Sequence, residues 1–181
     1  MKKEIVAPIV VLTVICLFIA AILAFTNQVT APIIKAAADQ RAEQARLETM
    51  PEADGFTKLE CSGLPETVQE VYEANNGAGY VFMLKTKGYG GDMELICGID
   101  GEGKITSCKT LSHSETAGVG AKTAEEPFRS QFTGVGEDLA GVSAISGATI
   151  SSTAYIGAIQ DAFTAYNLSL IHILLRQGHR L

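Results

Sequence analysis

Residues 67–86 read TVQEVYEANNGAGYVFMLKT, and this stretch contains the clearest fold signal in the chain. Polar and apolar residues approximately alternate over 67–74, and an apolar run returns over 80–86. The intervening Asn75-Asn-Gly-Ala-Gly supplies residues that are typical of a turn. Alternation with a period of two on either side of such a turn predicts a β-hairpin.

Further elements on the C-terminal side of this hairpin predict an α+β fold. Two more strands are expected at 93–99 and 104–111, joined by a tight turn at Asp100-Gly-Glu-Gly. A short helix is expected at 125–132 and a longer one at 149–166. We therefore expect one antiparallel sheet with flanking helices.

The N-terminal region contains the uncharged apolar segment IVAPIVVLTVICLFIAAILAF at residues 5–25. An α-helix of about 20 apolar residues crosses the hydrocarbon core of a membrane, whereas the apolar core of a cleaved signal peptide has roughly 7–15. We therefore expect residues 1–27 to form an uncleaved single-pass anchor in the cell (inner) membrane. Basic residues lie on both flanks of this segment and do not decide its orientation. The short N-terminal stub resembles that of a signal anchor, so we expect the rest of the chain on the extracytoplasmic side.

The rest of the chain divides into three expected parts. Residues 28–50 are rich in Ala, Gln, Glu and Arg and predict a helical stalk. Residues 51–167 form the expected globular domain. The string LSLIHI at 168–173 back-translates to the end of a transposon adaptor used in DNA library preparation, which predicts that residues 168–181 are a sequencing artefact or non-native tail. A genuine apolar C-terminal segment is the alternative.

Charge and cysteine spacing argue against two classes of function. Residues 28–167 contain 10 basic and 19 acidic residues, so nucleic-acid binding is not expected. No metal site is expected, because Cys61, Cys97 and Cys108 are far apart and His113 is the only histidine before the tail. Cys97 and Cys108 lie in neighbouring predicted strands, where either a disulfide or two buried thiols fits.

The segment Val142-Ser-Ala-Ile-Ser-Gly-Ala-Thr-Ile-Ser-Ser-Thr is the strongest candidate for a binding site. Ser146, Gly147 and Ala148 are small and leave room for a bulky group near the backbone, and Thr149 presents a hydroxyl where the last helix begins. Free N–H groups and the positive end of the helix dipole make such a terminus suitable for a phosphate. From spacing alone, a Ser/Thr cap on an amphipathic helix is the simpler explanation.

Three motifs together resemble the FMN-binding domain family. Ser146-Gly-Ala-Thr-Ile-Ser is similar to the family's S-G-A-T-x-[ST] flavinylation motif. Gly88-Tyr-Gly-Gly and His113-Ser-Glu-Thr-Ala-Gly-Val-Gly-Ala-Lys resemble the G-Y-G-G and H-x-E-T-P-G-L-G-A-K segments of one branch. That branch comprises the G subunits of Rnf complexes, which are ion-translocating ferredoxin:NAD oxidoreductases. The motifs follow the family's order, and the resemblance covers essentially residues 1–167.

The resemblance implies an electron-transfer subunit, with no catalytic residue of its own, rather than a stand-alone enzyme. In the family, a flavin transferase attaches FMN to the threonine through a phosphodiester bond, which would make Thr149 the covalent anchor. The expected partners are this transferase and the other membrane subunits of the Rnf complex. The remaining cofactor-binding residues implied are Ser146, Gly147, Ala148 and Ser151 at the phosphate end, Glu115, Thr116, Gly118 and Gly120 along the flavin, and Tyr89 on the ring, with His113 and Lys122 as weaker candidates.

Two other functions fit the sequence. One is a related covalent-flavin carrier, either the C subunit of a Na-translocating NADH:quinone reductase or an independent extracellular flavoprotein. The other is a membrane-anchored binding module without flavin. The chain also departs from the family pattern, because Ser143 stands where the family usually has Asp, and Ala117 and Val119 replace Pro and Leu. If that Asp assists flavin transfer, slow or incomplete modification is expected.

Overall fold

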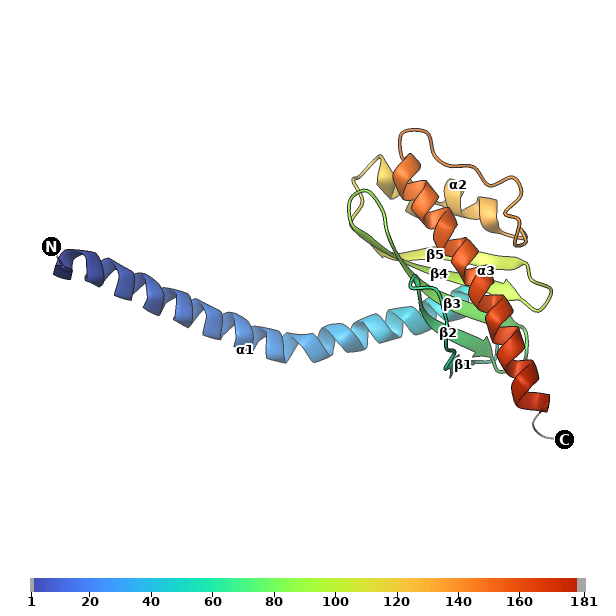
Figure 1. The fold of residues 1–181 in the computed structure, drawn as a ribbon, viewed down its shortest axis with the longest axis horizontal. Coiled ribbons are helices and arrows are strands. Elements are labelled where there is room, and N and C mark those ends of the chain that lie inside the picture. The colour runs from blue at the N-terminus through green and yellow to red at the C-terminus, as the bar shows by residue number, and fades with distance from the viewer. Residues whose placement is uncertain (1, 179–181) are drawn as a thin grey trace. The chain divides into compact units, whose positions relative to one another are not determined.

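The computed structural model describes the backbone of residues 2–178 and the side chains of residues 8–169. The chain forms two compact units, Met1–Ala42 and Glu43–Leu181. Helix α1 (Lys2–Thr49) forms the first unit and continues into the second. The predicted anchor and stalk are therefore parts of one continuous helix (Figure 1).

Helix α1 contains one segment that is long and apolar enough to cross a membrane. Its large apolar side chains from Ile9 to Ile34 are exposed in the structure. Burial of these side chains in a lipid bilayer would remove that apolar surface from water. The predicted N-terminal apolar helix is thus confirmed.

The second unit is built on a five-stranded antiparallel sheet in the order β1-β2-β3-β4-β5 (Figure 1). Its strands are β1 (Phe56–Leu59), β2 (Val68–Ala74), β3 (Gly79–Lys87), β4 (Asp92–Asp100) and β5 (Ile105–His113).

The four predicted strands are confirmed, whereas β1 was not predicted from the sequence. That strand has only four residues, and neither of its apolar ends is fully buried. Its pattern is therefore too short to show a period of two.

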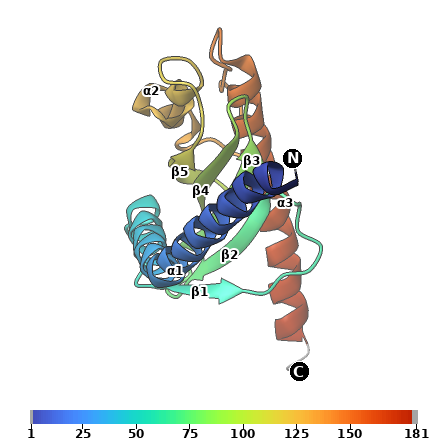
Figure 2. The same ribbon diagram turned by 90° about the vertical axis from the view of Figure 1, so that its left-hand side faces the viewer.

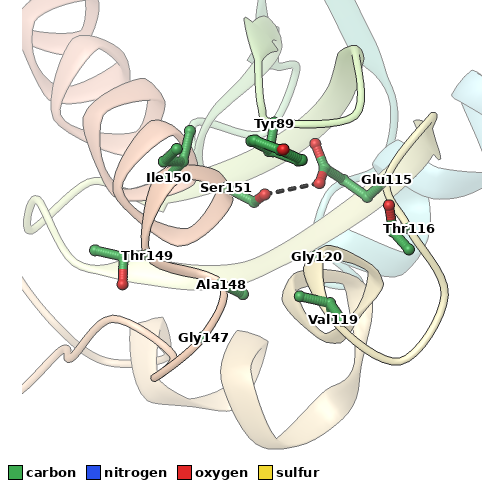
Figure 3. Close-up of a pocket in the computed structure, with 10 residues that line it drawn as sticks. All are labelled: Tyr89, Glu115, Thr116, Val119, Gly120, Gly147, Ala148, Thr149, Ile150 and Ser151. Atoms are coloured by element: carbon green, nitrogen blue, oxygen red, sulfur yellow. Dashed lines mark hydrogen bonds between the residues drawn. The ribbon is translucent and has the colours of Figure 1, made fainter.

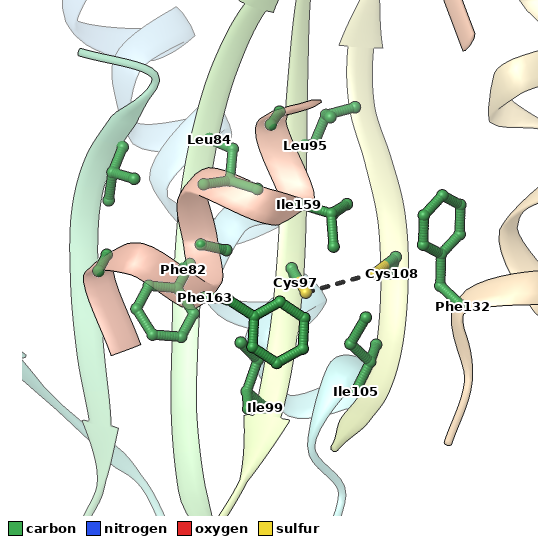
Figure 4. Close-up of a cluster of buried hydrophobic side chains, with 14 of the residues drawn as sticks. Phe82, Leu84, Leu95, Cys97, Ile99, Ile105, Cys108, Phe132, Ile159 and Phe163 are labelled. Carbon is green, nitrogen blue, oxygen red and sulfur yellow. Dashed lines mark hydrogen bonds between the residues drawn. The ribbon is translucent and has the colours of Figure 1, made fainter. Parts of the chain in front are cut away.

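Both faces of the sheet are covered, which explains the almost uninterrupted apolar run of β4. Leu95, Cys97 and Ile99 face a core formed with α3, as Figure 4 shows. Ile96 faces the opposite way, into a smaller cluster that includes Ala45 near the end of α1. Residues 43–50 therefore pack with the sheet unit.

Three helical segments follow β5 before the last helix: η1 (Gly120–Ala124, a 3-10 helix), α2 (Glu126–Arg129) and η2 (Ser130–Phe132). The single helix predicted for 125–132 is thus divided between α2 and η2, which lie near β5 (Figure 2).

Helix α3 (Thr149–Gly178) packs along the sheet and begins at the predicted residue. It continues beyond the predicted end near 166, because no glycine or proline occurs between 167 and 177.

An aromatic cluster joins α3 to these short helices. The rings of Phe128 and Phe132 each lie 5.3 Å from that of Tyr155, measured between centroids. Tyr155 and Phe132 are fully buried. The cluster therefore fixes the first half of α3 against the β5 side of the sheet.

The variant Phe132→Ala is expected to reduce the free energy of unfolding by about 3–5 kcal/mol, because it leaves a cavity within this cluster. Leu47→Ala is the control, since Leu47 is exposed and its replacement should change stability by less than about 0.5 kcal/mol. Thermal unfolding of the detergent-solubilised chain measures both. Equal effects of the two variants would contradict this packing.

Candidate functional site

Three segments that are distant in sequence meet at one end of the sheet. They are the β3–β4 loop at residues 88–91, the segment 114–120 that follows β5, and the start of α3. Lys87 pairs with Asp92 and Met93 pairs with His113, so the first two segments leave the sheet at the same end.

These segments surround a cavity of about 440 Å³ (Figure 3). It is lined by Tyr89, Glu115, Thr116, Val119, Gly120, Gly147, Ala148, Thr149, Ile150 and Ser151.

Glu115 connects all three segments through its buried carboxylate. Oε1 accepts a hydrogen bond from the Gly90 N–H at 3.0 Å, and Oε2 accepts one from the Ser151 hydroxyl at 2.7 Å (Figure 3). The Glu115 N–H donates to Nδ1 of His113 at 3.3 Å. A buried carboxylate needs such partners to offset the loss of hydration, and here its oxygens bond to the β3–β4 loop and to the first turn of α3, two of the segments that form the cavity.

Two glycines make room for this carboxylate, and a third allows close approach to the backbone beside it. A Cβ atom at Gly88 would overlap Oε1 of Glu115, and a Cβ at Gly120 would overlap Oε2. A Cβ at Gly90 would clash with the backbone of Ser114 at 2.5 Å from its carbonyl oxygen. The glycines of the two upstream motifs are therefore required by close packing around Glu115.

The start of α3 is shaped by a local hydrogen-bond pattern. The Ser152 hydroxyl accepts from the Ile145 N–H at 3.1 Å and donates to the Ala148 carbonyl at 2.8 Å. Gly147 has a φ of +84°, a backbone conformation that L side chains rarely adopt. This turn leaves the Thr149 side chain exposed at the first residue of the helix, where N–H groups lack acceptors within the helix.

The rim of the cavity is unusually apolar for an exposed surface. Within residues 43–169, the large hydrophobic side chains that are exposed are those of Leu47, Tyr89, Val119 and Ile150, and the last three line this cavity. Tyr89 is 76% exposed and Ile150 is 60% exposed. Exposed apolar groups gathered at one cavity are typical of a ligand-binding site.

The structure brings together most of the residues predicted from the sequence. Ser146 and Gly118 do not line the cavity, although both lie in segments that form it. Gly118 has a φ of +76°, a backbone conformation that favours glycine, so its role is to allow the turn that precedes η1. His113 and Lys122 do not line the cavity: Nδ1 of His113 accepts a hydrogen bond from the Glu115 N–H, and Lys122 lies in η1.

Val119 and Ile150 line the cavity, but neither was predicted from the sequence as a binding residue. Ile150 occupies the unspecified position of the S-G-A-T-x-[ST] motif, and Val119 replaces the leucine of the upstream motif. Single apolar residues of this kind carry no chemical signature of a site. Their exposure in the folded domain is the observation that identifies them.

Comparisons with known proteins agree with this location. The FMN-binding domain family matches residues 88–164, a range that includes every residue lining the cavity. The G subunit of the proton-translocating ferredoxin:NAD(+) oxidoreductase complex of Clostridium ljungdahlii is 30% identical over 83% of this chain and 85% of its own length. The chain belongs to the family of G subunits of ion-translocating oxidoreductase complexes.

Two further G subunits show similar agreement along the chain. The G subunit of the ion-translocating oxidoreductase complex of Methanosarcina acetivorans is 33% identical over 89% of this chain and 94% of its own length. The G subunit of the Na(+)-translocating ferredoxin:NAD(+) oxidoreductase complex of Acetobacterium woodii is 32% identical, with coverages of 88% and 90%. The similarity to the G-subunit family therefore extends well beyond the matched FMN-binding domain.

In this G-subunit fold, Gly120→Ala is expected to destabilise the domain by about 1–3 kcal/mol, because the added Cβ would overlap the Glu115 carboxylate. Gly157→Ala is the matched control. A Cβ at Gly157 meets nothing within 4 Å, and alanine is the better helix former by about 0.5–1 kcal/mol. Thermal unfolding should show opposite shifts for the two variants. A neutral Gly120→Ala would argue against close packing at Glu115.

Proposed function

We propose that this chain is the membrane-anchored, FMN-carrying electron-transfer subunit of an ion-translocating ferredoxin:NAD oxidoreductase complex. The observation that carries the proposal is the meeting of Thr149 with three exposed apolar side chains at one cavity, inside the region that matches the FMN-binding domain family. The type of complex is inferred from the relatives, which are named as G subunits of ferredoxin:NAD(+) oxidoreductase complexes.

The residues around the cavity suit the two chemically different ends of FMN. A phosphate group suits the start of α3, where helix N–H groups and the helix dipole favour negative charge. Gly147 adds no side chain there, and Ala148 adds only a methyl group. An aromatic ring system suits the apolar side chains of Tyr89, Val119 and Ile150.

We further propose that FMN is attached covalently through a phosphodiester bond to the Thr149 hydroxyl. The Thr149 side chain is exposed, so a separate flavin transferase can reach it. Ser151 is also in the cavity, but its buried hydroxyl donates to Glu115. Thr149 is therefore the more accessible of these two hydroxyl groups.

Bound FMN would supply the ability to accept and donate one or two electrons. The protein's own contribution is binding and orientation. Glu115 holds the Tyr89 loop and the first turn of α3 in a fixed relation, because its two oxygens bond to Gly90 and Ser151. Rigid placement of this kind keeps a cofactor at a constant distance from its redox partners.

The proposal includes a location and partners. Helix α1 would anchor the chain in the cell membrane, with the FMN domain on the extracytoplasmic side. The other membrane subunits of the complex are the expected partners of α1. The orientation rests on the short N-terminal stub, because basic residues flank the apolar segment on both sides and do not decide it: Lys2 and Lys3 precede it, and Lys35, Arg41 and Arg46 follow it.

Intact mass spectrometry of the full-length chain co-expressed with a flavin transferase tests the attachment. We expect a gain of about 438 Da, which corresponds to one FMN phosphodiester. Thr149→Ala should remove the adduct completely. Thr153→Ala is the matched control, because Thr153 is an exposed threonine on the same helix outside the cavity, and its variant should keep the adduct.

Two results would contradict the covalent assignment. One is an adduct that survives in Thr149→Ala, and the other is the absence of any adduct in a chain that unfolds cooperatively. In the second case, retention of flavin by the native chain, measured by its absorbance, would separate non-covalent FMN binding from a module without flavin.

A separate prediction concerns Ser143, which is exposed and whose N–H and hydroxyl both donate to Oε1 of Gln131 at 3.0 and 3.3 Å. If an Asp at this position assists flavin transfer, Ser143→Asp should raise the initial rate of adduct formation several-fold. Ser143→Asn is the control: asparagine is similar in size to aspartate but uncharged, so this variant should not raise the rate. Equal rates of adduct formation for the two variants would show that a carboxylate at position 143 does not assist flavin transfer.

A further inference from the structure

Cys97 and Cys108 lie directly opposite one another on β4 and β5. Their sulfur atoms are 3.4 Å apart, and both side chains point into the core beneath α3 (Figure 4). Both are free thiols and both are buried, with exposed fractions of 0% and 2%. The proposed flavin function uses neither of them.

The register of this pair and its sulfur separation of 3.4 Å are compatible with a disulfide. Opposed residues in an antiparallel pair have Cα atoms about 4.5 or 5.5 Å apart, and disulfides span Cα distances of roughly 4.4–6.8 Å. The two strands are therefore spaced within the range that disulfides bridge, and bond formation needs the two sulfur atoms to approach one another from 3.4 Å.

We propose that Cys97 and Cys108 form a disulfide bond that joins β4 to the edge strand β5. The position matters because β4 begins directly after the Tyr89 loop and β5 ends directly before the Glu115 segment. The bond would thus hold together the two strands from which two walls of the cavity extend.

The reaction is a thiol–disulfide exchange in which the disulfide of an exchange protein or of glutathione is the oxidant. One cysteine thiolate attacks the external disulfide and releases one thiol, and the second thiolate then displaces the other. The two cysteines lose two protons and two electrons in total, and one external disulfide becomes two thiols.

Burial determines when this exchange takes place. Desolvation raises the pKa of the Cys108 thiol well above its usual value, so its reactive thiolate is scarce in the folded domain. The pair also lies within the hydrophobic core that Ile159 and Phe163 of α3 help to form (Figure 4). We therefore expect exchange when the core opens during folding, and resistance to reduction afterwards.

Peptide mapping of the purified full-length chain tests the proposal. The reduced protein is incubated with glutathione disulfide across a series of urea concentrations, returned to native buffer and alkylated under denaturing conditions. We expect Cys97 and Cys108 peptides to be linked and lighter by two hydrogens, with formation fastest near the unfolding midpoint. Cys16 and Cys61 should be recovered without a link to another cysteine of the chain, as alkylated peptides or as mixed disulfides with glutathione.

Stability supplies a second measurement. Oxidation should raise the melting temperature by about 5–10 °C, because the bond closes a short loop in the unfolded chain. Cys97→Ala should abolish this shift between oxidised and reduced samples, whereas Cys61→Ala should preserve it. Three results would overturn the proposal. They are alkylation of both Cys97 and Cys108 after the oxidation step, a disulfide between either of them and Cys61, and a lower melting temperature for the chain with the Cys97–Cys108 bond.

Discussion

The carboxylate of Glu115 holds the candidate site together. It is buried, and its two oxygens bond to the loop that precedes β4 and to the first turn of α3. Removal of a buried acceptor leaves its donors without partners, at a cost of about 1–3 kcal/mol for each. The cavity therefore depends on one side chain that comes from neither the β3–β4 loop nor the helix.

The sheet provides the frame for this contact. Side chains of β3 and β4 are buried in hydrophobic clusters on both faces of the sheet, and the aromatic cluster of Phe128, Phe132 and Tyr155 packs α3 over one of those faces. The first turn of α3 is thereby brought to the end of the sheet where Tyr89 and Glu115 lie. Core packing and site geometry are consequently coupled through the same helix.

Much of this architecture could be predicted from the sequence, for identifiable physical reasons. The strands at 68–74, 79–87, 92–100 and 105–113 have strong local patterns and turn residues between them. Strand β1 was not predicted, because its four residues are too few to show the two-residue alternation typical of a strand. The end of α3 was placed too early because a change in amphipathic pattern is a weaker stop signal than glycine or proline.

The sequence by itself determined the apolar helix, the antiparallel hairpins and the start of the last helix, since each depends on residues that are neighbours along the chain. It also indicated the three motifs that belong to a common site. Only the tertiary structure decided that Gly88 and Gly120 pack against one carboxylate, and that Val119 and Ile150 join Tyr89 at the rim. The hydrogen bonds of that carboxylate join residues 25 and 36 positions apart in sequence. Periodicity and propensity are local properties, whereas such contacts depend on how the strands and helices pack.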